Sequence, residues 1–343
     1  MIFQKSCNEK TLYINNLQII LRYFGQINTF MTNLTPISVV GSCISRQIIR
    51  PMPSYNTEFK MFYTDENDTR FRQKISADAV PPGRIADRLY DEMAGFVYGL
   101  PWLEDQLAYD IRLQFEYVTK PFTIQSTIDH AKLSPAGVIY VDLTNELLPS
   151  VITEDEDFLL KNNWLQLAPH FPEWFQEIVQ RNTYQFDMYD KTMTMQRHHN
   201  LRRAVDIINS ANQPVVAIGN VYTNKVFSYV SNTVVENLSF YNSKIPFLKV
   251  DRTGQLDETI NYNYIKEQID GFYRICQTEK MSPGWTWVNV EEDCYADPQH
   301  PWGPHPIHLH IESRKVIAQR LEQAFWSSLR ESNPYLRLTK SEF

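Results

Sequence analysis

The stretch Pro36-Ile37-Ser38-Val39-Val40-Gly41-Ser42-Cys43-Ile44-Ser45-Arg46 decides how this chain folds. Its first half is apolar and β-branched behind a proline, which predicts a short buried strand. Gly41 then allows a sharp turn in which the backbone lies close to a neighbour. Three isoleucines further on have the spacing of one helix face. The stretch therefore predicts a strand, a glycine turn and a helix, with Ser42, Cys43 and Ser45 at the corner.

Cys43 would lie at the N-terminus of that helix. Unpaired backbone N–H groups and the positive end of the helix dipole lower the pKa of a thiol there and increase its thiolate fraction. A cysteine is equally often a small buried apolar residue. The corner therefore predicts either an activated nucleophile or a plain strand-turn-helix with a buried cysteine.

The composition is that of a globular protein, with 343 residues, 13% aromatic and 21% charged. Such a length suits one large α/β domain or a domain with insertions. The net charge of −7 argues against a partner such as nucleic acid, whose sequence-independent binding needs a basic face. The four cysteines show no C-x-x-C spacing, so we expect neither a zinc site nor a disulfide framework.

The N-terminus has no apolar segment behind basic residues, and no apolar run approaches the ~20 residues of a membrane span. We therefore expect a cytoplasmic protein without a membrane span. Residues 1–30 are an N-terminal extension or a first element, ahead of a single domain over residues 31–343. Prolines predict an irregular insertion near 51–83, and an acidic, then aromatic stretch predicts a helical insertion near 151–200.

Further elements follow from apolar runs and their periodicity. The runs at 136–143, 213–220 and 285–290 predict buried strands. The alternation of helices and strands is typical of a parallel α/β sheet. We also expect strands near 59–63, 113–118 and 245–250, and helices over 84–98, 124–133, 201–208, 226–241 and 316–325.

The corner also resembles a known motif. Gly41-Ser42-Cys43-Ile44-Ser45 is similar to the first block of the SGNH (GDSL-type) hydrolases, G-D-S-L-S, with cysteine in place of the nucleophilic serine. It is closer still to the bacterial GSCFA-motif proteins and to a group with G-S-C-x-S-R among cell-surface polysaccharide functions. The resemblance implies a flavodoxin-like three-layer α/β/α sandwich with a central parallel sheet. Cys43 is then the nucleophile with Ser42 as its rival, and Gly41, Ser45 and Arg46 bind substrate.

A second block follows the strand at 136–143. SGNH proteins have G-x-N-D after an internal strand, and its asparagine donates to the oxyanion. Asp142-Leu143-Thr144-Asn145-Glu146 occupies the comparable place without the glycine and the final aspartate. Asn145 is therefore the oxyanion candidate, and Asp142 is the alternative polar group. An asparagine at such a joint is also common as a helix cap.

The last block precedes the final helix, where SGNH hydrolases have D-x-x-H. Asp297-Pro298-Gln299-His300 has that spacing, which implies His300 as the general base and Asp297 as the group that orients it. The G-S-C-x-S-R group has a similar H-x-W-G and a later histidine. By that comparison Trp302 and Gly303 bind substrate, and His308 is either a pocket residue or the base.

Four of the eight histidines fall in this loop. The loop could be a proline-rich structural segment, or its histidines could bind a metal. Because no cysteine or acidic ligands match them, we expect no metal.

The resemblance of the three blocks, which occur in the order found in these families, implies an esterase or acyltransferase that acts on a carbohydrate or polysaccharide ester. Acyl-CoA is possible as a donor to a glycan acceptor, and no other cofactor is expected. The alternative is a non-catalytic SGNH-fold protein that binds glycan or acts as a scaffold in polysaccharide biosynthesis. The missing aspartate of the first block and the absent G-x-N-D favour that alternative.

Overall fold

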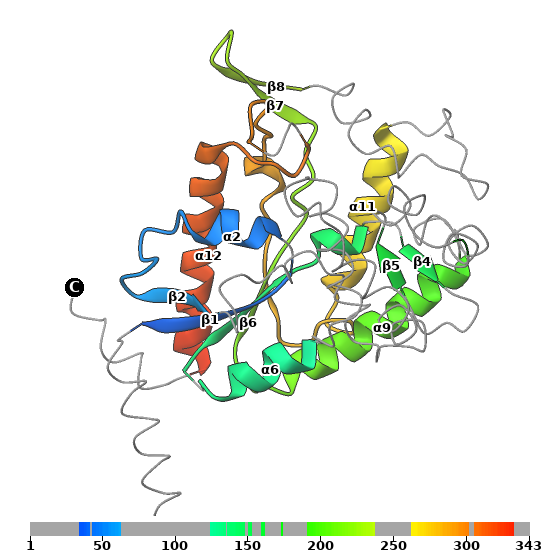
Figure 1. Cartoon of the computed structure of the whole chain (residues 1–343), viewed down its shortest axis with the longest axis vertical. Helices are drawn as coiled ribbons and strands as arrows, with labels where there is room; N and C mark the ends of the chain where they lie inside the picture. Colours follow the sequence, from blue (N-terminus) through cyan, green and yellow to red (C-terminus); the bar gives the residue numbers. More distant parts are fainter. Residues whose placement is uncertain are drawn as a thin grey trace, which may run out of the picture.

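The computed structural model describes residues 34–41, 43–62, 124–134, 136–147, 150–152, 159–161, 173, 191–236, 262–301 and 305–332. Its elements follow one another as β1 (Thr35–Val40), α2 (Cys43–Ile49), β2 (Phe59–Phe62), α6 (Ile124–Lys132), β3 (Val138–Asp142), η2 (Thr144–Leu147), β4 (Ser150–Ile152), β5 (Leu159–Lys161), α9 (Lys191–Asn209), β6 (Val215–Ile218), β7 (Lys225–Ser228), β8 (Thr233–Glu236), α11 (Tyr262–Cys276), β9 (Thr286–Val288), η5 (Glu291–Asp293) and α12 (Ile311–Ser332). Figure 1 shows their arrangement.

Five strands form one sheet in the order β2-β1-β3-β6-β9, and every neighbouring pair is parallel. Counted along the chain this order is 2-1-3-4-5, an order of doubly wound α/β sheets. The direction of winding reverses between β1 and β3, and ligands of such sheets bind beside the carboxyl ends of the strands at that reversal. The predicted α/β class with a central parallel sheet is confirmed.

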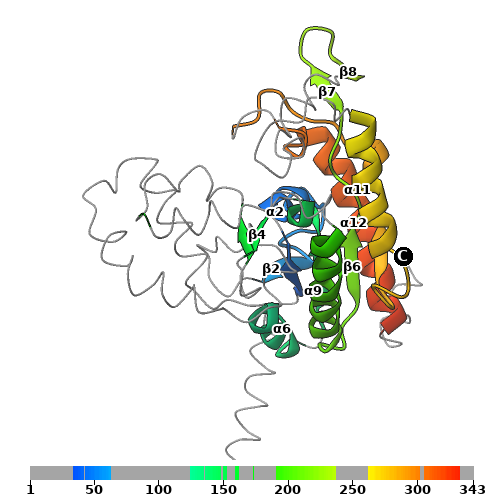
Figure 2. The same ribbon diagram turned by 90° about the vertical axis from the view of Figure 1, so that its right-hand side faces the viewer.

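The inner strands are largely apolar because helices cover both faces of the sheet. All five residues of β3 and all four of β6 are buried. Ile139 and Val141 of β3 belong to the core cluster with α6, α9 and α11. Val138 and Tyr140 belong to the cluster with α2 and α12. Figures 1 and 2 show α2 close to α12, and α6 close to α9.

The core around α12 is largely aromatic. Phe325 of α12 lies edge-on to Tyr140 of β3, with 6.1 Å between ring centroids. Phe59 of β2 contacts both Phe325 and Trp326, at 5.7 and 4.6 Å. These rings fix the last helix across the strands that lead to the site.

Most strands and helices predicted in the described residues are confirmed. The structure has β2, α6, β3, β6, β9 and α12 where the sequence predicts them, and the helix at 201–208 is the second half of α9. The sequence also predicts Val316 on the apolar face of α12 with Ile317, Leu321 and Phe325, but Val316 is 43% exposed whereas those three are buried. The elements predicted over 84–98, 113–118 and 245–250, and residues 1–30, lie outside the described residues.

The helix predicted around 226–241 is wrong. The segment 226–241 begins instead with the antiparallel pair β7–β8, whose turn includes Asn232 at φ 54°. Asparagine tolerates this left-handed backbone, and the flanking valines and threonine favour strand. Of the insertion predicted near 151–200, the described residues include the antiparallel pair β4–β5 at its start and the first part of α9 at its end.

None of the described helices is both long and apolar enough to cross a membrane.

Candidate active site

The corner at Gly41–Ser45, called the nucleophile corner because it contains the candidate nucleophile Cys43, lies where the sequence predicts it. β1 is flanked by β2 and β3 in the sheet and ends at Val40, and α2 begins at Cys43. The prediction that Cys43 lies at the carboxyl end of an inner parallel strand and at a helix N-terminus is therefore confirmed for its backbone. Ser42 and the side chain of Cys43 lie outside the described part of the chain.

Gly41 packs directly against the end of β3. A Cβ atom at Gly41 would lie 2.6 Å from Cβ of Asp142 and 3.0 Å from the Asp142 carbonyl oxygen. Nonbonded carbon atoms approach no closer than about 3.5 Å at their optimum. Only glycine therefore fits, and it brings the nucleophile corner onto the end of the neighbouring strand.

Asp142 ends β3 as a buried carboxylate with several donors. Its Oδ2 accepts a hydrogen bond from Ser45 Oγ at 3.0 Å. Its Oδ1 accepts from the Thr144 backbone N–H at 2.8 Å and from the Thr144 hydroxyl. A buried carboxylate needs such donors, because the burial of a charge without hydrogen bonds costs folding free energy. Ser45, expected to bind substrate, is fully buried and joins α2 to β3.

These bonds separate the roles proposed for Asp142 and Asn145. Asp142 caps η2 through the Thr144 N–H, so the capping role falls to Asp142. A carboxylate engaged as an acceptor has no N–H or O–H for an oxyanion. Asn145 remains the oxyanion candidate within η2, and its side chain lies outside the described residues.

Two tyrosines lie close to Asp142 in the core. Burial, followed by the charge of Asp142, raises the pKa of Tyr140 and of Tyr273 well above the usual value. Both phenols therefore stay protonated beside Asp142.

The histidine-rich segment folds back on itself between η5 and α12. Its two sides pair through the Asp297 N–H to the His308 carbonyl at 2.8 Å and the His310 N–H to the Tyr295 carbonyl at 3.0 Å. Figures 1 and 2 show this loop beyond the carboxyl ends of the sheet strands, on the side where α2 begins. Ile44 of α2 and Leu309 of the loop belong to the same buried cluster.

The loop brings both candidate bases together. The rings of His300 and His308 stack with centroids 4.4 Å apart, and His305 lies 5.4 Å from His308. His300 is buried, whereas His308 is half-buried. Asp297 shares a turn with His300, whose backbone N–H donates to the Asp297 carbonyl at 3.2 Å. Trp302 and Gly303 lie outside the described residues.

The surroundings of His300 keep its imidazole neutral. Burial lowers its pKa from 6.5 to about 4, with help from His308 and Arg314 and against the opposing effect of Asp297. A neutral imidazole can accept a proton from a thiol at physiological pH. His300 is therefore in the protonation state that a general base needs.

The lowered pKa of His300 predicts a loss of folding stability in acid. Between pH 6.5 and about 4 the unfolded state binds a proton at this histidine and the folded state does not. Stability should therefore fall as the pH drops through this window, and His300→Gln should reduce that fall. Urea unfolding of the wild type and of His300→Gln at pH 4.5 and pH 7 measures the difference, since the two proteins share every other titratable group. An equal loss in both would show that His300 is not held neutral.

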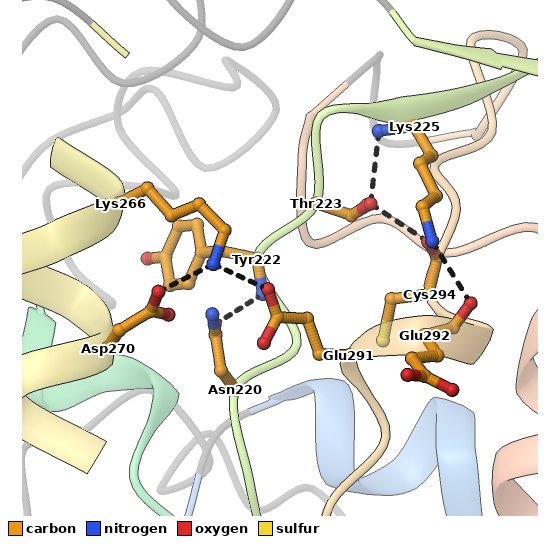
Figure 3. A network of polar contacts seen from close by, with 9 residues as sticks. All are labelled: Asn220, Tyr222, Thr223, Lys225, Lys266, Asp270, Glu291, Glu292 and Cys294. Carbon is orange, nitrogen blue, oxygen red and sulfur yellow. Dashed lines mark hydrogen bonds and ion pairs between the residues drawn. The ribbon is translucent and has the colours of Figure 1, made fainter. Parts of the chain in front are cut away.

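A network of polar contacts holds η5 in place ahead of the loop (Figure 3). Lys266 of α11 forms ion pairs with Asp270 at 2.5 Å and with Glu291 of η5 at 2.8 Å. Lys225 Nζ donates to the Glu292 carbonyl at 3.2 Å, and the Thr223 hydroxyl donates to the Cys294 carbonyl at 2.8 Å. The segment after β6, helix α11 and η5 are thus joined where the loop begins.

Two residues near the histidines were not predicted from sequence. Tyr229, just after β7, donates its hydroxyl hydrogen bond to Asp297 Oδ1 at 2.9 Å. Arg314, in the first turn of α12, acts electrostatically on both His300 and Asp297. Arg314 follows His310 by four residues, and residues four apart are neighbours on a helix, so this spacing could have indicated that Arg314 lies close to the histidine loop. Tyr229 gave no signal, because its segment was predicted as helix.

Within the described residues, no three side chains of histidine, cysteine, aspartate or glutamate are grouped to hold a metal ion.

The chain was compared with known proteins. No protein-family model matches it, and no curated protein matches it.

Proposed function

We propose that the protein is an esterase or acyltransferase of the SGNH type, with a flavodoxin-like three-layer fold, that acts on a carbohydrate or polysaccharide ester. One observation supports this proposal above the others: the Cys43 corner, the end of β3 and the histidine loop all lie at the carboxyl edge of one doubly wound sheet. Ligands of such sheets bind at this edge. The similarity of the three sequence blocks to SGNH hydrolases supports the same class.

The proposed reaction begins with the Cys43 thiol, with Ser42 as the rival nucleophile. His300 accepts the thiol proton as sulfur attacks the acyl carbonyl, and Asp297 orients the imidazole. Asn145 and backbone N–H groups near Cys43 donate to the oxyanion. The leaving alcohol or thiol takes the proton from His300, which leaves an acyl thioester on Cys43. Water or a sugar hydroxyl then accepts the acyl group, so the chemistry covers both hydrolysis and transfer from acyl-CoA.

The proposal predicts that Cys43 reacts with iodoacetamide faster than the other described thiols. Cys276 and Cys294 are 2% and 0% exposed, and burial raises the pKa of Cys294. The labelling rate of Cys43 should rise with a midpoint below the ~8.5 of an ordinary thiol. Peptide mass spectrometry after timed labelling measures each site. Equal labelling of all thiols, or protection of Cys43 alone, argues against a catalytic thiol.

Turnover of a p-nitrophenyl ester and of acetylated oligosaccharides tests the reaction itself. Cys43→Ala should abolish turnover, and Cys276→Ala, which removes another thiol, should leave it unchanged. An unchanged rate in Cys43→Ala transfers the nucleophile role to Ser42, and Ser42→Ala then decides.

A second candidate function is a non-catalytic glycan-binding or scaffolding protein. The hydrogen bonds that Asp297 accepts in the described part of the chain come from Tyr229 and from the Gln299 N–H, both to Oδ1. A carboxylate engaged in this way has a structural role without any chemistry. Glycan binding without turnover, unaffected by Cys43→Ala, is the result that would favour this function.

A further inference from the structure

We propose that Tyr229 is a positioning residue of the site: its hydroxyl fixes the Asp297 carboxylate in the orientation that lets Asp297 hold the His300 imidazole. The inference rests on the proposed function, in which Asp297 orients the base. It adds the β7–β8 hairpin to the elements that build the site.

Two donors meet on one oxygen of Asp297. The Tyr229 hydroxyl and the Gln299 backbone N–H both donate to Oδ1, each at 2.9 Å. Two donors on the same oxygen determine the rotation of the carboxylate about its Cβ–Cγ bond. Because both bonds are on Oδ1, Oδ2 is the carboxylate oxygen that would accept from an imidazole N–H.

The Tyr229 ring is held by aromatic neighbours. Its centroid lies 5.0 Å from that of Phe227 and 6.1 Å from that of His310. Phe227 stacks on His310 at 4.3 Å, and His310 stacks on Tyr295 at 5.4 Å. The ring is thus anchored to the same loop that contains Asp297.

Backbone bonds attach the hairpin to that loop. The Phe227 N–H donates to the Ala296 carbonyl at 3.0 Å, and the Ala296 N–H donates to the Lys225 carbonyl at 2.8 Å. Ala296 immediately precedes Asp297, so β7 and the carboxylate are held in register. Figure 1 shows the hairpin extending away from the sheet with its base against the loop.

The charges around the imidazole give the sign of the expected effect. The groups that act on His300 are His308 and Asp297 of the loop and Arg314 of α12, and Tyr229 reaches it through Asp297. Burial and the bond to Asp297 raise the pKa of the Tyr229 phenol, so the hydroxyl remains a donor. Without this donor the negative charge of Asp297 is less neutralised, which favours the imidazolium form of His300.

Tyr229→Phe removes the hydroxyl and keeps the ring, and because Tyr229 is 45% exposed we expect the variant to fold. The His300 titration should move to higher pH, followed by NMR of ring-labelled histidine and assigned with His300→Gln. For ester turnover we expect kcat to fall about tenfold with KM unchanged, in line with the loss of one hydrogen bond to a charged group. Tyr295→Phe is the matched control, since it removes a hydroxyl from the same aromatic group.

The outcomes separate this inference from the proposed function. A shifted His300 titration in Tyr229→Phe but not in Tyr295→Phe supports the positioning role, even if the wild-type protein turns over no ester and the proposed function fails. A His300 titration unchanged by Tyr229→Phe overturns the inference, whatever the activity. A fall in kcat of equal size in both variants also overturns it, because the effect is then one of aromatic packing.

Discussion

His300→Ala is expected to lower kcat for ester turnover by roughly 10⁴-fold, as loss of the base of a catalytic triad does. The expectation follows from the position and protonation of this ring. His300 is buried, shares a turn with Asp297, and has its pKa lowered to about 4 by burial. Steady-state kinetics with a p-nitrophenyl ester measures the loss, and KM should change only a few-fold.

His308→Ala is the matched control, because the two rings stack with centroids 4.4 Å apart and both are candidates for the base. We expect its effect mainly on KM, since the half-buried ring of His308 is suited to line a substrate pocket. The acid limb of kcat/KM in the wild type should lie well below 6.5 if His300 is the base. A large loss of kcat in His308→Ala alone would make His308 the base and leave the Asp297–His300 spacing a coincidence.

The sequence predicts the centre of this fold well because its signals there are local. The runs that become β1, β3 and β6 are β-branched and apolar, and strands covered on both faces need that composition. The glycine after β1 predicts the turn, and the isoleucines that follow this glycine predict α2. The alternation of strands and helices in the chain predicts that the sheet is parallel, but it does not fix the order of the strands.

Contacts between distant segments could not be predicted in the same way. The bond from Ser45 to Asp142 joins residues 97 positions apart, and no pattern in either segment specifies it. The bond from Tyr229 to Asp297 depends on β7–β8 being a hairpin. That segment was predicted as helix. Its strands are only four residues long, and over so few positions the alternation of a strand is hard to distinguish from the periodicity of a helix.

The histidine loop was predicted by motif, and its geometry adds what a motif cannot. The D-x-x-H spacing places Asp297 and His300 in one turn, as the structure has them. It says nothing of His308, which reaches His300 only because the loop folds back and pairs Asp297 with His308 through the backbone. The close approach of the two rings leaves the choice of base to the kinetics of the two variants.

Gly41→Ala is expected to destabilise the protein by about 2–3 kcal/mol, which is a large cost for adding one methyl group. The new Cβ would lie 2.6 Å from Asp142 Cβ, and 3.0 Å from the Asp142 carbonyl oxygen and from Ser45 Oγ. The Asp142 Cβ and carbonyl oxygen move only with the backbone of β3, and the Ser45 hydroxyl is held by its hydrogen bond to Asp142, so β1 and β3 must separate. That separation would also strain the buried bond between Ser45 and Asp142.

Gly271→Ala is expected to change the stability of the same protein in the opposite direction. Gly271 lies within α11, and a Cβ atom there would meet no atom within 4 Å. Alanine in a helix interior is favoured over glycine, so this variant should be more stable by about 1 kcal/mol. Urea unfolding of the two variants and the wild type measures both changes, and iodoacetamide labelling of Cys43 should change in Gly41→Ala alone. If Gly41→Ala proves as stable as the wild type, the turn before Cys43 does not pack against Asp142. The nucleophile corner would then lie elsewhere than over the end of β3.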